Sequence, residues 1–355
     1  MKKRTINGVA IRAVTAALPE HKITENDFAL LFGAKEVNRI AASTGIRSIR
    51  EAKSLHTSDL ILAACQNLFK NGVVQPTDID GLVVVTQTPD EWSPGLGYKV
   101  QHELGLSVDC LVLDIVAGCA GYVNALIQCG ALINAGSCKK VLLCTGDVTT
   151  KLIDDKDRHV RMLFGDGASA TLLEPGDNSF EYITGVDGGG NTALGAHIEY
   201  GSDPRSSVSA LIGRLHMDGT AVMNFALSRV PSTVKALLSS TGLCSKTLDL
   251  LVLHQANEFM INYIRRIIGI DSDKVPIDVD GIGNTSSTSI PIVLSRHYAI
   301  GTAKAKNVIL CGFGAGLSWA AIYVNLENTR AVSPVYVLNS VAPIDNENRP
   351  EYVPI

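Results

Sequence analysis

The segment DIVAGCAGYVNALIQCGALINAG, residues 114–136, carries no charged side chain after its first residue. An uncharged segment of this length could span a membrane, form a buried structural helix, or hold Cys119 as a reactive thiol in a protected pocket. Asn124, Gln128 and Asn134 would be costly facing lipid, and no second segment of this kind occurs in the chain. The segment therefore predicts a buried helix whose small residues let other backbone approach closely.

Length and composition indicate a folded enzyme. The 355 residues suffice for one large domain or two ordinary ones, and 46% are hydrophobic against 19% charged. The net charge of -4 gives no general reason to expect nucleic-acid binding. The eight cysteines lack metal-like spacing, which is typical of buried thiols in a reducing compartment, and Arg12 interrupts the apolar N-terminus, which argues against a signal peptide. We therefore expect a cytoplasmic protein.

Two strand-like segments recur, in the same order, in the second half of the chain. DGLVVVTQ (80–87) matches DLLVLHQ (249–255), and KKVLLCTG (139–146) matches KNVILCGFG (306–314), at offsets of 169 and 167 residues. Buried strands can share Val and Leu by chance, but two matches at nearly one offset favour a duplicated α/β unit. Helical patterns lie around 57–71, 119–135, 224–240 and 257–268. Strands that alternate with helices predict sheets covered on both faces.

The duplication relates Cys119 to the segment GIGNTSSTSIPIVLS (281–295). Both positions precede an apolar helical stretch, so two helix N-termini would face a common centre. A helix N-terminus favours anions, and we therefore expect a depressed pKa for the Cys119 thiol. Cys119 is the strongest candidate nucleophile among the eight cysteines, and a buried, inert thiol is the alternative that its position alone leaves open.

Three further segments favour the catalytic interpretation. LVLHQANEFMI (251–261) places His254 at the end of an apolar run, GIGNTSSTS places Asn284 in a Gly-rich loop, and LCGFGAGLSWA (310–320) offers a turn rich in free backbone groups. Separately, each has an ordinary structural explanation. Together they supply a nucleophile, a base or donor, a second donor and an oxyanion site.

These motifs resemble those of a known family. DIVAGCAGYVNAL, LHQAN, GNTSSTSIP and GFGAGLSWA, in this order, resemble β-ketoacyl-acyl carrier protein synthase III, of the thiolase fold. STGIRSIR (43–50) and MLFGDGASATLLE (162–174) fit the same pattern, which covers roughly residues 5–325. The resemblance implies an α/β fold of two duplicated βαβαβαββ halves in a five-layered arrangement, and a homodimer. The halves would span residues 1–175 and 176–327, followed by a C-terminal extension at 328–355.

The resemblance also implies a decarboxylative Claisen condensation in fatty-acid or specialised acyl-chain biosynthesis. Cys119 would accept an acyl group from a thioester, and a malonyl thioester on acyl carrier protein would lose carbon dioxide and attack it. His254 and Asn284 would hydrogen-bond the malonyl thioester oxygen, and amides of Cys119, Gly314 and Ala315 would bind the tetrahedral oxyanion. Coenzyme A or acyl carrier protein thioesters would be the substrates, without a metal, a bound cofactor, a nucleic acid or a membrane.

The sequence departs from the family at the predicted donor and carrier sites. Arg39 and Ser43 stand where initiating enzymes usually have the Trp and Arg that hold the coenzyme A nucleotide. Phe259 replaces an Arg that docks carrier protein, and His159 stands where glycine is usual. The departures predict a specialised member. The predicted substrate-binding residues are Arg39, Ser43, Arg158, His159, Phe164 and Asn257, and the predicted carrier-docking residues are Phe259, Arg265 and Arg266.

Two other functions fit the same residues. A related thiolase-fold acyltransferase would pass the acyl group from Cys119 to a small-molecule nucleophile without decarboxylation, and malonyl-dependent release of carbon dioxide distinguishes it. A non-enzymatic subunit would only bind a synthase or a carrier. The presence of Cys119, His254 and Asn284 argues against that role, and failure of Cys119 to become acylated would favour it.

Overall fold

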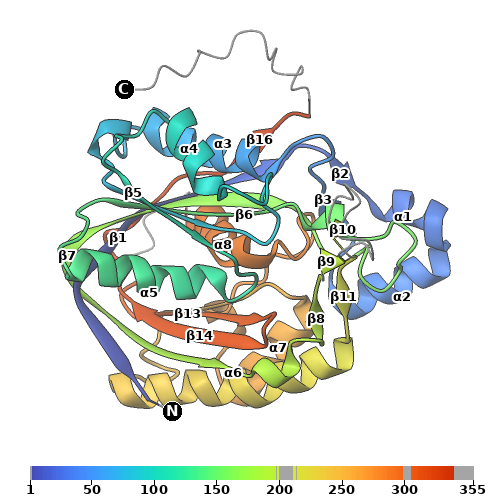
Figure 1. Cartoon of the computed structure of the whole chain (residues 1–355). Helices are drawn as coiled ribbons and strands as arrows, with labels where there is room; N and C mark the ends of the chain where they lie inside the picture. Colours follow the sequence, from blue (N-terminus) through green and yellow to red (C-terminus); the bar gives the residue numbers. More distant parts are fainter. Residues whose placement is uncertain (1, 197, 200–210, 213, 299–304, 340–355) are drawn as a thin grey trace, which may run out of the picture.

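Helices and sheets alternate in five layers in the computed structural model, which describes residues 2–196, 198–199, 211–212, 214–298 and 305–339 (Figure 1). The helices α1 (Glu25–Phe32) and α2 (Ala34–Thr44) flank the layers at one side. The first layer holds α3 (Thr57–Lys70) and α4 (Leu96–Glu103), and a first sheet lies beneath it. The central layer holds α5 (Gly121–Asn134) and α8 (Ser289–Tyr298). A second sheet follows, and the last layer holds α6 (Gly219–Thr241) and α7 (Glu258–Ile268). The arrangement confirms the predicted layered α/β fold.

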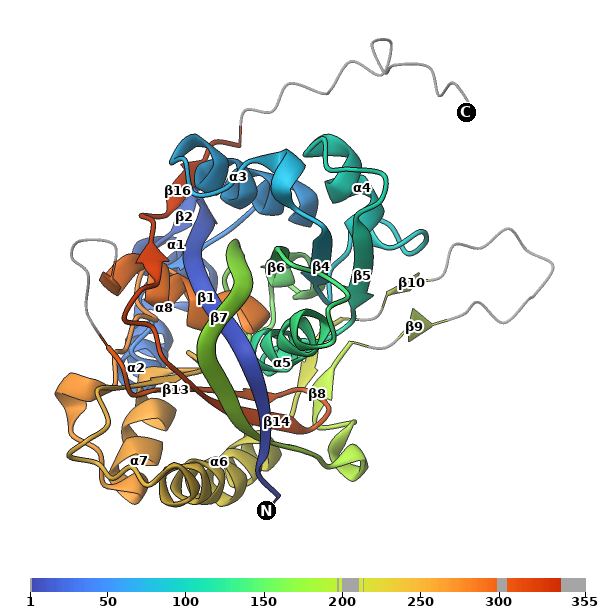
Figure 2. The same cartoon turned by 90° about the vertical axis from the view of Figure 1, so that its left-hand side faces the viewer.

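Two long strands, β1 (Arg4–Pro19) and β7 (Gly167–Val186), belong to both sheets (Figure 2). The first part of β7 pairs with β6 (Val141–Asp147), and its last part pairs with β14 (Ser318–Val324). β1 lies antiparallel to β7 along most of its length. The first sheet continues from β6 to β4 (Gly81–Val85) and β5 (Leu111–Ile115), and the second from β14 to β13 (Val308–Gly314) and β12 (Leu250–Leu253).

The strands predicted to be duplicated have the same pairing in both sheets. β4 and β6 are parallel neighbours, as are β12 and β13. In each sheet the next strand, β7 or β14, is antiparallel. The proposed boundary after residue 175 falls inside β7, so the two halves share a strand, and the boundaries themselves stay a prediction. The remaining short strands are β2 (Lys22–Ile23), β3 (Ile49–Arg50), β8 (Leu194–Gly195), β9 (Ile198–Glu199), β10 (Leu211–Ile212) and β11 (His216–Met217).

The strands β4, β12 and β13 each contribute alternate residues to two hydrophobic cores, because helices cover both faces of their sheets. Leu82 and Val84 of β4 pack with α3 and α4, whereas Val83 and Val85 pack with α5. In the second sheet, β12 and β13 divide their residues in the same way between α5 and α8 on one side and α6 and α7 on the other. Burial on both faces explains why these strands read as unbroken apolar runs.

The uncharged segment 114–136 forms the end of β5, a loop and the buried helix α5, as predicted. Gly130 of α5 allows close packing, because a Cβ at this position would lie 3.1 Å from the ring of Phe180. Within the described ranges, no helix is both long and apolar enough to cross a membrane. The helix begins at Gly121, so Cys119 lies in the loop that leads into it.

The described part of the C-terminal extension covers the outer edge of β1. β15 (Arg330–Ala331) and β16 (Val335–Val337) pair with β1 in parallel. The amide of Val332 between them donates to the carbonyl of Val14 at 2.9 Å. The Ser295 hydroxyl of α8 donates to the Val332 carbonyl at 2.7 Å. Residues 328–339 therefore tie the edge strand to the helix layer, and residues 340–355 lie outside the described part of the chain.

Truncation after residue 327 should destabilise the protein. It removes β15 and β16, whose hydrogen bonds contribute roughly 1 kcal/mol each, and it exposes the edge of β1 to pairing with other chains. We expect a melting temperature several degrees lower and a larger aggregated fraction, measured by calorimetry and size-exclusion chromatography. Truncation after residue 339 keeps both strands and is the control. Equal stability of the two truncated chains would contradict a structural role for the strands.

Candidate active site

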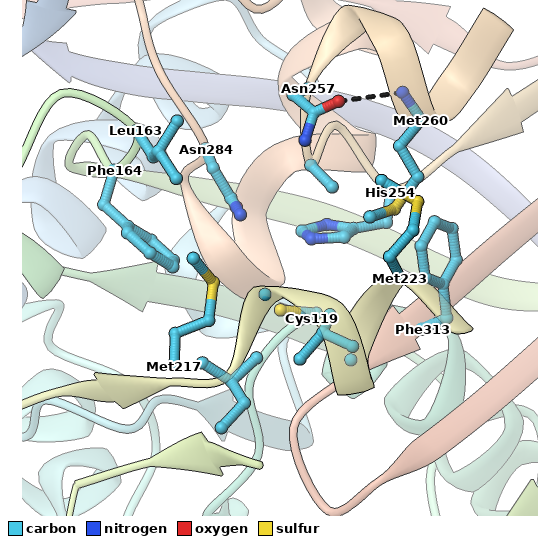
Figure 3. Close-up of a pocket in the computed structure, with 15 residues that line it drawn as sticks. Cys119, Leu163, Phe164, Met217, Met223, His254, Asn257, Met260, Asn284 and Phe313 are labelled. Atoms are coloured by element: carbon cyan, nitrogen blue, oxygen red, sulfur yellow. Dashed lines mark hydrogen bonds between the residues drawn. The ribbon is translucent and has the colours of Figure 1, made fainter. Parts of the chain in front are cut away.

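One cavity of about 230 Å³ brings Cys119, His254 and Asn284 together (Figure 3). They come from three separate segments: the loop before α5, the end of β12 and the loop before α8. All three residues are buried. The walls are otherwise mostly apolar, with Leu163, Phe164, Leu194, Met217, Val222, Met223, Ala256, Met260 and Phe313 among the lining residues. Together with Asn257, which also lines it, the cavity has four polar side chains in an apolar wall, the arrangement expected of a binding or catalytic site.

The position of Cys119 depends on two glycines of β13. A Cβ at Gly312 would lie 2.8 Å from the Cα of Ala120, and a Cβ at Gly314 would lie 2.7 Å from the Cβ and Sγ of Cys119. Gly314 also has a φ of 154°, within the range that side chains rarely adopt. The backbone of β13 can therefore approach Cys119 closely, and the amide of Ala315 interacts with the Cys119 sulfur.

Burial raises the pKa of the Cys119 thiol to about 11, so the expected depressed pKa is wrong. Hydrogen bonds from the amides of Ala315 and Cys119 favour the thiolate, but they do not offset the loss of solvation. The charge of Asp147 raises the pKa further. Because α5 has Ala120 as its N-cap, the sulfur also lies before the first turn of the helix. Cys119 is therefore a neutral thiol near pH 7.

His254 is a neutral imidazole held at the end of β12. Burial lowers the pKa of His254 to about 3. Its amide donates to the carbonyl of Cys311 at 2.8 Å, and its ring meets the Phe313 ring edge-on at 5.5 Å. Nδ1 lies 2.7 Å from the hydroxyl of Ser289. These contacts leave Nε2 for the cavity that His254 lines (Figure 3).

Asn284 is oriented by hydrogen bonds on both its side chain and its backbone. Its Oδ1 accepts from the amide of Ser286 at 2.9 Å, which leaves the amide NH₂ to face the cavity (Figure 3). Its backbone amide donates to the carbonyl of Leu163, and its carbonyl accepts from the amide of Gly165. A Cβ at Gly165 would overlap the carbonyl of Ile282, so glycine is required there. The loop is thus fixed against the segment MLFGDG.

Two of the predicted substrate-binding residues, Phe164 and Asn257, line the cavity that holds Cys119. Phe164 follows Leu163 in the segment that holds the Asn284 loop. The side chain of Asn257 caps α7 by accepting from the amide of Met260 at 2.8 Å (Figure 3). Oδ1 of Asn257 therefore has a partner within the helix, while the residue also lines the cavity.

The predicted residues Arg39, Arg158 and His159 gather around Glu36 and do not line this cavity. The guanidinium of Arg39 donates to both carboxylate oxygens of Glu36, at 2.7 and 3.1 Å. Hydrogen bonding to Arg39 lowers the pKa of Glu36, and the charges of Arg158 and His159 add to the effect. The guanidinium of Arg39 is thus already paired.

A second cavity, of about 260 Å³, lies between α2 and α7 and has Ser43, Phe259 and Arg266 in its lining. The Ser43 hydroxyl donates to a backbone carbonyl of its own helix. Arg265 does not line this cavity and donates instead to Oδ1 of Asn262 at 2.8 Å. The structure therefore brings two of the three predicted docking residues together with one predicted donor-binding residue.

The sequence interpretation missed a buried polar group behind Cys119. Oδ1 of Asp147 accepts from the amide of Gln87 at 2.8 Å, and Oδ2 accepts from the hydroxyl of Ser287 at 2.6 Å. The side chain of Gln87 donates to the hydroxyl of Ser286 at 2.8 Å. Burial raises the pKa of Asp147 to about 6. Two features of the sequence could have indicated this group: an acidic residue that ends an apolar strand, and the run of hydroxyl residues SSTS (286–289).

Within the described residues, no group of three or more His, Cys, Asp or Glu side chains is placed to hold a metal ion.

The sequence matches two family descriptions. Residues 113–192 match "3-Oxoacyl-[acyl-carrier-protein (ACP)] synthase III", and residues 238–326 match its C-terminal counterpart. A β-ketoacyl-(acyl-carrier-protein) synthase III of Lactococcus lactis is 32% identical over 323 residues, which are 89% of this chain and 98% of the relative. The first match contains Cys119 and the second contains His254 and Asn284.

Solved structures agree with the sequence matches. A 3-oxoacyl-(acyl-carrier protein) synthase of Burkholderia xenovorans is 32% identical with a TM-score of 0.88, covering 95% of this chain and 99% of that one. The priming β-ketosynthase of the R1128 polyketide pathway is 29% identical with a TM-score of 0.80, covering 90% and 96%. With its layered fold and its buried cysteine, histidine and asparagine, this chain belongs to the 3-oxoacyl-(acyl-carrier-protein) synthase III family of condensing acyltransferases.

Proposed function

We propose that Cys119, His254 and Asn284 carry out the reaction of this condensing enzyme, which joins an acyl group to a malonyl unit with loss of carbon dioxide. Their convergence supports the proposal, because a thiol and two hydrogen-bond donors from three separate segments line one apolar cavity. The substrates are thioesters of acyl carrier protein or coenzyme A, and the product is a β-ketoacyl thioester. The chemistry requires no bound cofactor.

In the first half-reaction, the sulfur of Cys119 bonds to the carbonyl carbon of the acyl thioester. The bond from that carbon to the donor sulfur breaks, and the thiol hydrogen ends on the departing thiol. Negative charge collects on the carbonyl oxygen of the tetrahedral intermediate. The amides of Cys119 and Ala315, which interact with the sulfur, are the proposed donors to this oxygen. Gly314 leaves the space that the intermediate needs.

In the second half-reaction, the malonyl carboxylate leaves as carbon dioxide, and the electron pair of the broken bond forms an enolate. Nε2 of His254 and the amide NH₂ of Asn284 are the proposed donors to the enolate oxygen. The enolate carbon then attacks the acyl carbonyl, and the Cys119 sulfur leaves as a thiolate, which takes a proton from water to restore the thiol. A neutral imidazole suits this step, because a cation would stabilise the carboxylate that must be lost.

The acyl donor is proposed to be a carrier-bound acyl group or a specialised coenzyme A thioester. The contacts of Arg39 and Ser43 support this proposal. Arg39 is paired with Glu36, and Ser43 donates to a carbonyl of its own helix. A serine offers no planar face, so these two residues cannot enclose a nucleotide base between them. Arg158 supplies further positive charge near Glu36.

Acyl carrier protein is proposed to dock beside α7, at Phe259, Arg265 and Arg266. Phe259 is about half exposed, and it lines the second cavity together with Arg266. The guanidinium groups can meet a phosphate or acidic side chains, and the aromatic ring adds apolar contact area. The cavity adjoins the start of α7, where Asn257 lines the catalytic site.

A second copy of the chain is the proposed partner at β5. β5 ends its sheet, and no described strand pairs with its outer edge. Leu113 of β5 and Val116, which follows the strand, are exposed, as is Tyr98 of the neighbouring helix α4. An unpaired edge with apolar neighbours suits continuation of the sheet into a homodimer.

A cytoplasmic location is also proposed. The eight cysteines are all free thiols, which supports it because the cytoplasm keeps thiols reduced.

Replacement of Cys119 by alanine should abolish both the acyl-enzyme and condensation, because no thiol remains to form the thioester. Intact mass spectrometry with a panel of acyl-coenzyme A and acyl-carrier donors measures the adduct and identifies the acyl group. Cys129→Ala removes a fully buried thiol from α5 itself and is the matched control, which should keep the adduct. An adduct on any other cysteine would refute the assignment.

His254→Ala and Asn284→Asp should slow malonyl decarboxylation by about 10²–10³-fold and affect loading of Cys119 less, since each removes a donor to the enolate oxygen. Asn284→Asp also places a carboxylate where negative charge must collect. Release of labelled carbon dioxide and growth of the acyl adduct are measured separately. Parallel losses in the two rates, in both variants, would show that the proposed division of roles is wrong.

Carrier-bound donors should load Cys119 faster than acetyl-coenzyme A does, because Arg39 and Ser43 lack a two-sided nucleotide clamp. The single-turnover rate of Cys119 loading is compared across several acyl chains, each attached to coenzyme A and to acyl carrier protein. The double variant Arg39→Trp/Ser43→Arg should raise the rate with acetyl-coenzyme A and leave that with carrier donors little changed. Rapid, saturable loading of the unmodified protein by acetyl-coenzyme A, ahead of every carrier donor, would contradict the proposal.

A further inference from the structure

The hydroxyl of Ser289 joins the catalytic histidine to the backbone. Its Oγ lies 2.7 Å from Nδ1 of His254 and 3.3 Å from the amide nitrogen of Gln255. Ser289 is buried and is the first residue of α8. The next residue, Ile290, is buried in the core between the two sheets, so the hydroxyl is held in place by the fold.

The hydrogens of this group can be assigned by elimination. A backbone amide only donates, so the Ser289 oxygen accepts from Gln255. The hydroxyl has one hydrogen of its own, and Nδ1 of His254 is its one acceptor among the contacts of the described residues. A proton on Nδ1 would give the oxygen two incoming hydrogens and leave its own hydrogen buried without an acceptor, which is disfavoured. Nδ1 therefore accepts, and the imidazole proton is on Nε2.

The Gln255 side chain keeps the donating amide in place. Its Nε2 donates to the carbonyl of Leu253 at 2.7 Å, and its Oε1 accepts from the amide of Asp278 at 2.8 Å. The backbone at Gln255 is thus tied to the strand before it and to the loop that leads toward Asn284. The Ser289 oxygen consequently meets a fixed donor on one side and the imidazole on the other.

We infer that Ser289 is a positioning residue, which holds His254 as the tautomer with its proton on Nε2. This inference rests on the proposed role of His254 as a donor to the enolate oxygen. In that tautomer, the Nε2 hydrogen and the NH₂ of Asn284 both face the cavity, so two donors are ready before the malonyl group arrives (Figure 3). In the other tautomer Nε2 would present a lone pair, which repels a developing oxyanion.

The matched control lies on the same helix. Ser295 is fully buried on α8, and its hydroxyl donates to the carbonyl of Val332 at 2.7 Å. Ser295→Ala therefore removes a buried hydroxyl and a hydrogen bond of similar length, but it does not touch the imidazole. If weakened packing of α8 slows decarboxylation, both variants should be slower. If the change of tautomer slows decarboxylation, only Ser289→Ala should be slower.

The tautomer itself is measured by ¹⁵N NMR of histidine-labelled protein, with the His254 signals identified by their absence from His254→Ala. The unmodified protein and Ser295→Ala should both show a protonated Nε2 and an unprotonated Nδ1. Ser289→Ala should show a larger share of the tautomer protonated on Nδ1. A protonated Nδ1 in the unmodified protein would overturn the inference, whatever the fate of the proposed reaction.

Kinetics then test the consequence. Ser289→Ala should slow malonyl decarboxylation by about 10–100-fold, a range typical for the loss of an orienting partner. Loading of Cys119 should stay within about twofold, and Ser289→Thr, which keeps the hydroxyl, should recover most of the rate. Unchanged decarboxylation in Ser289→Ala, or equal losses in Ser289→Ala and Ser295→Ala, would overturn the inference. If His254→Ala itself left decarboxylation intact, the proposed role of His254 would be wrong. The NMR result would still show independently whether Ser289 determines the tautomer of His254.

Discussion

The cavity that holds Cys119 depends on one close contact, where the backbone of β13 in the second sheet meets the loop between β5 and α5 that carries Cys119. Neither Gly312 nor Gly314 has a side chain, and a Cβ at either position would overlap this loop. The contact buries the thiol and brings the amide of Ala315 to its sulfur. The burial of the thiol and its contact with a backbone amide are therefore consequences of the same approach of backbone to backbone.

Burial has opposite effects on the two titrating groups of the cavity, yet it leaves both of them neutral. It raises the pKa of the Cys119 thiol and lowers that of the His254 imidazole, because loss of solvent disfavours the charged form of each. Asn284 is uncharged by nature. The cavity therefore holds no charged side chain at its centre before substrate arrives. Charge would appear only on the reacting atoms, where oriented N–H groups meet it without rearrangement.

Much of this fold could be predicted from local pattern, because β4, β6, β12 and β13 are apolar runs buried on both faces. The sharing of β1 and β7 between the two sheets could not be predicted, because the residues of a strand do not determine which strands it pairs with. Motifs pointed to Cys119, but the direction of its pKa shift depends on desolvation in the packed cavity. The pairing of Arg39 with Glu36 was visible in principle, because residues three apart on a helix are neighbours.

The continuous strand β7 also determines how the two sheets are held relative to each other. Its first part, at 167–173, completes the first sheet and its last part, at 181–186, completes the second, without a loop between them. One unit carries the thiol, and the other carries the imidazole and the amide. Because β7 runs unbroken from one sheet into the other, a rotation of one sheet against the other would have to bend this strand. The strand therefore holds the thiol in a fixed relation to the imidazole and the amide.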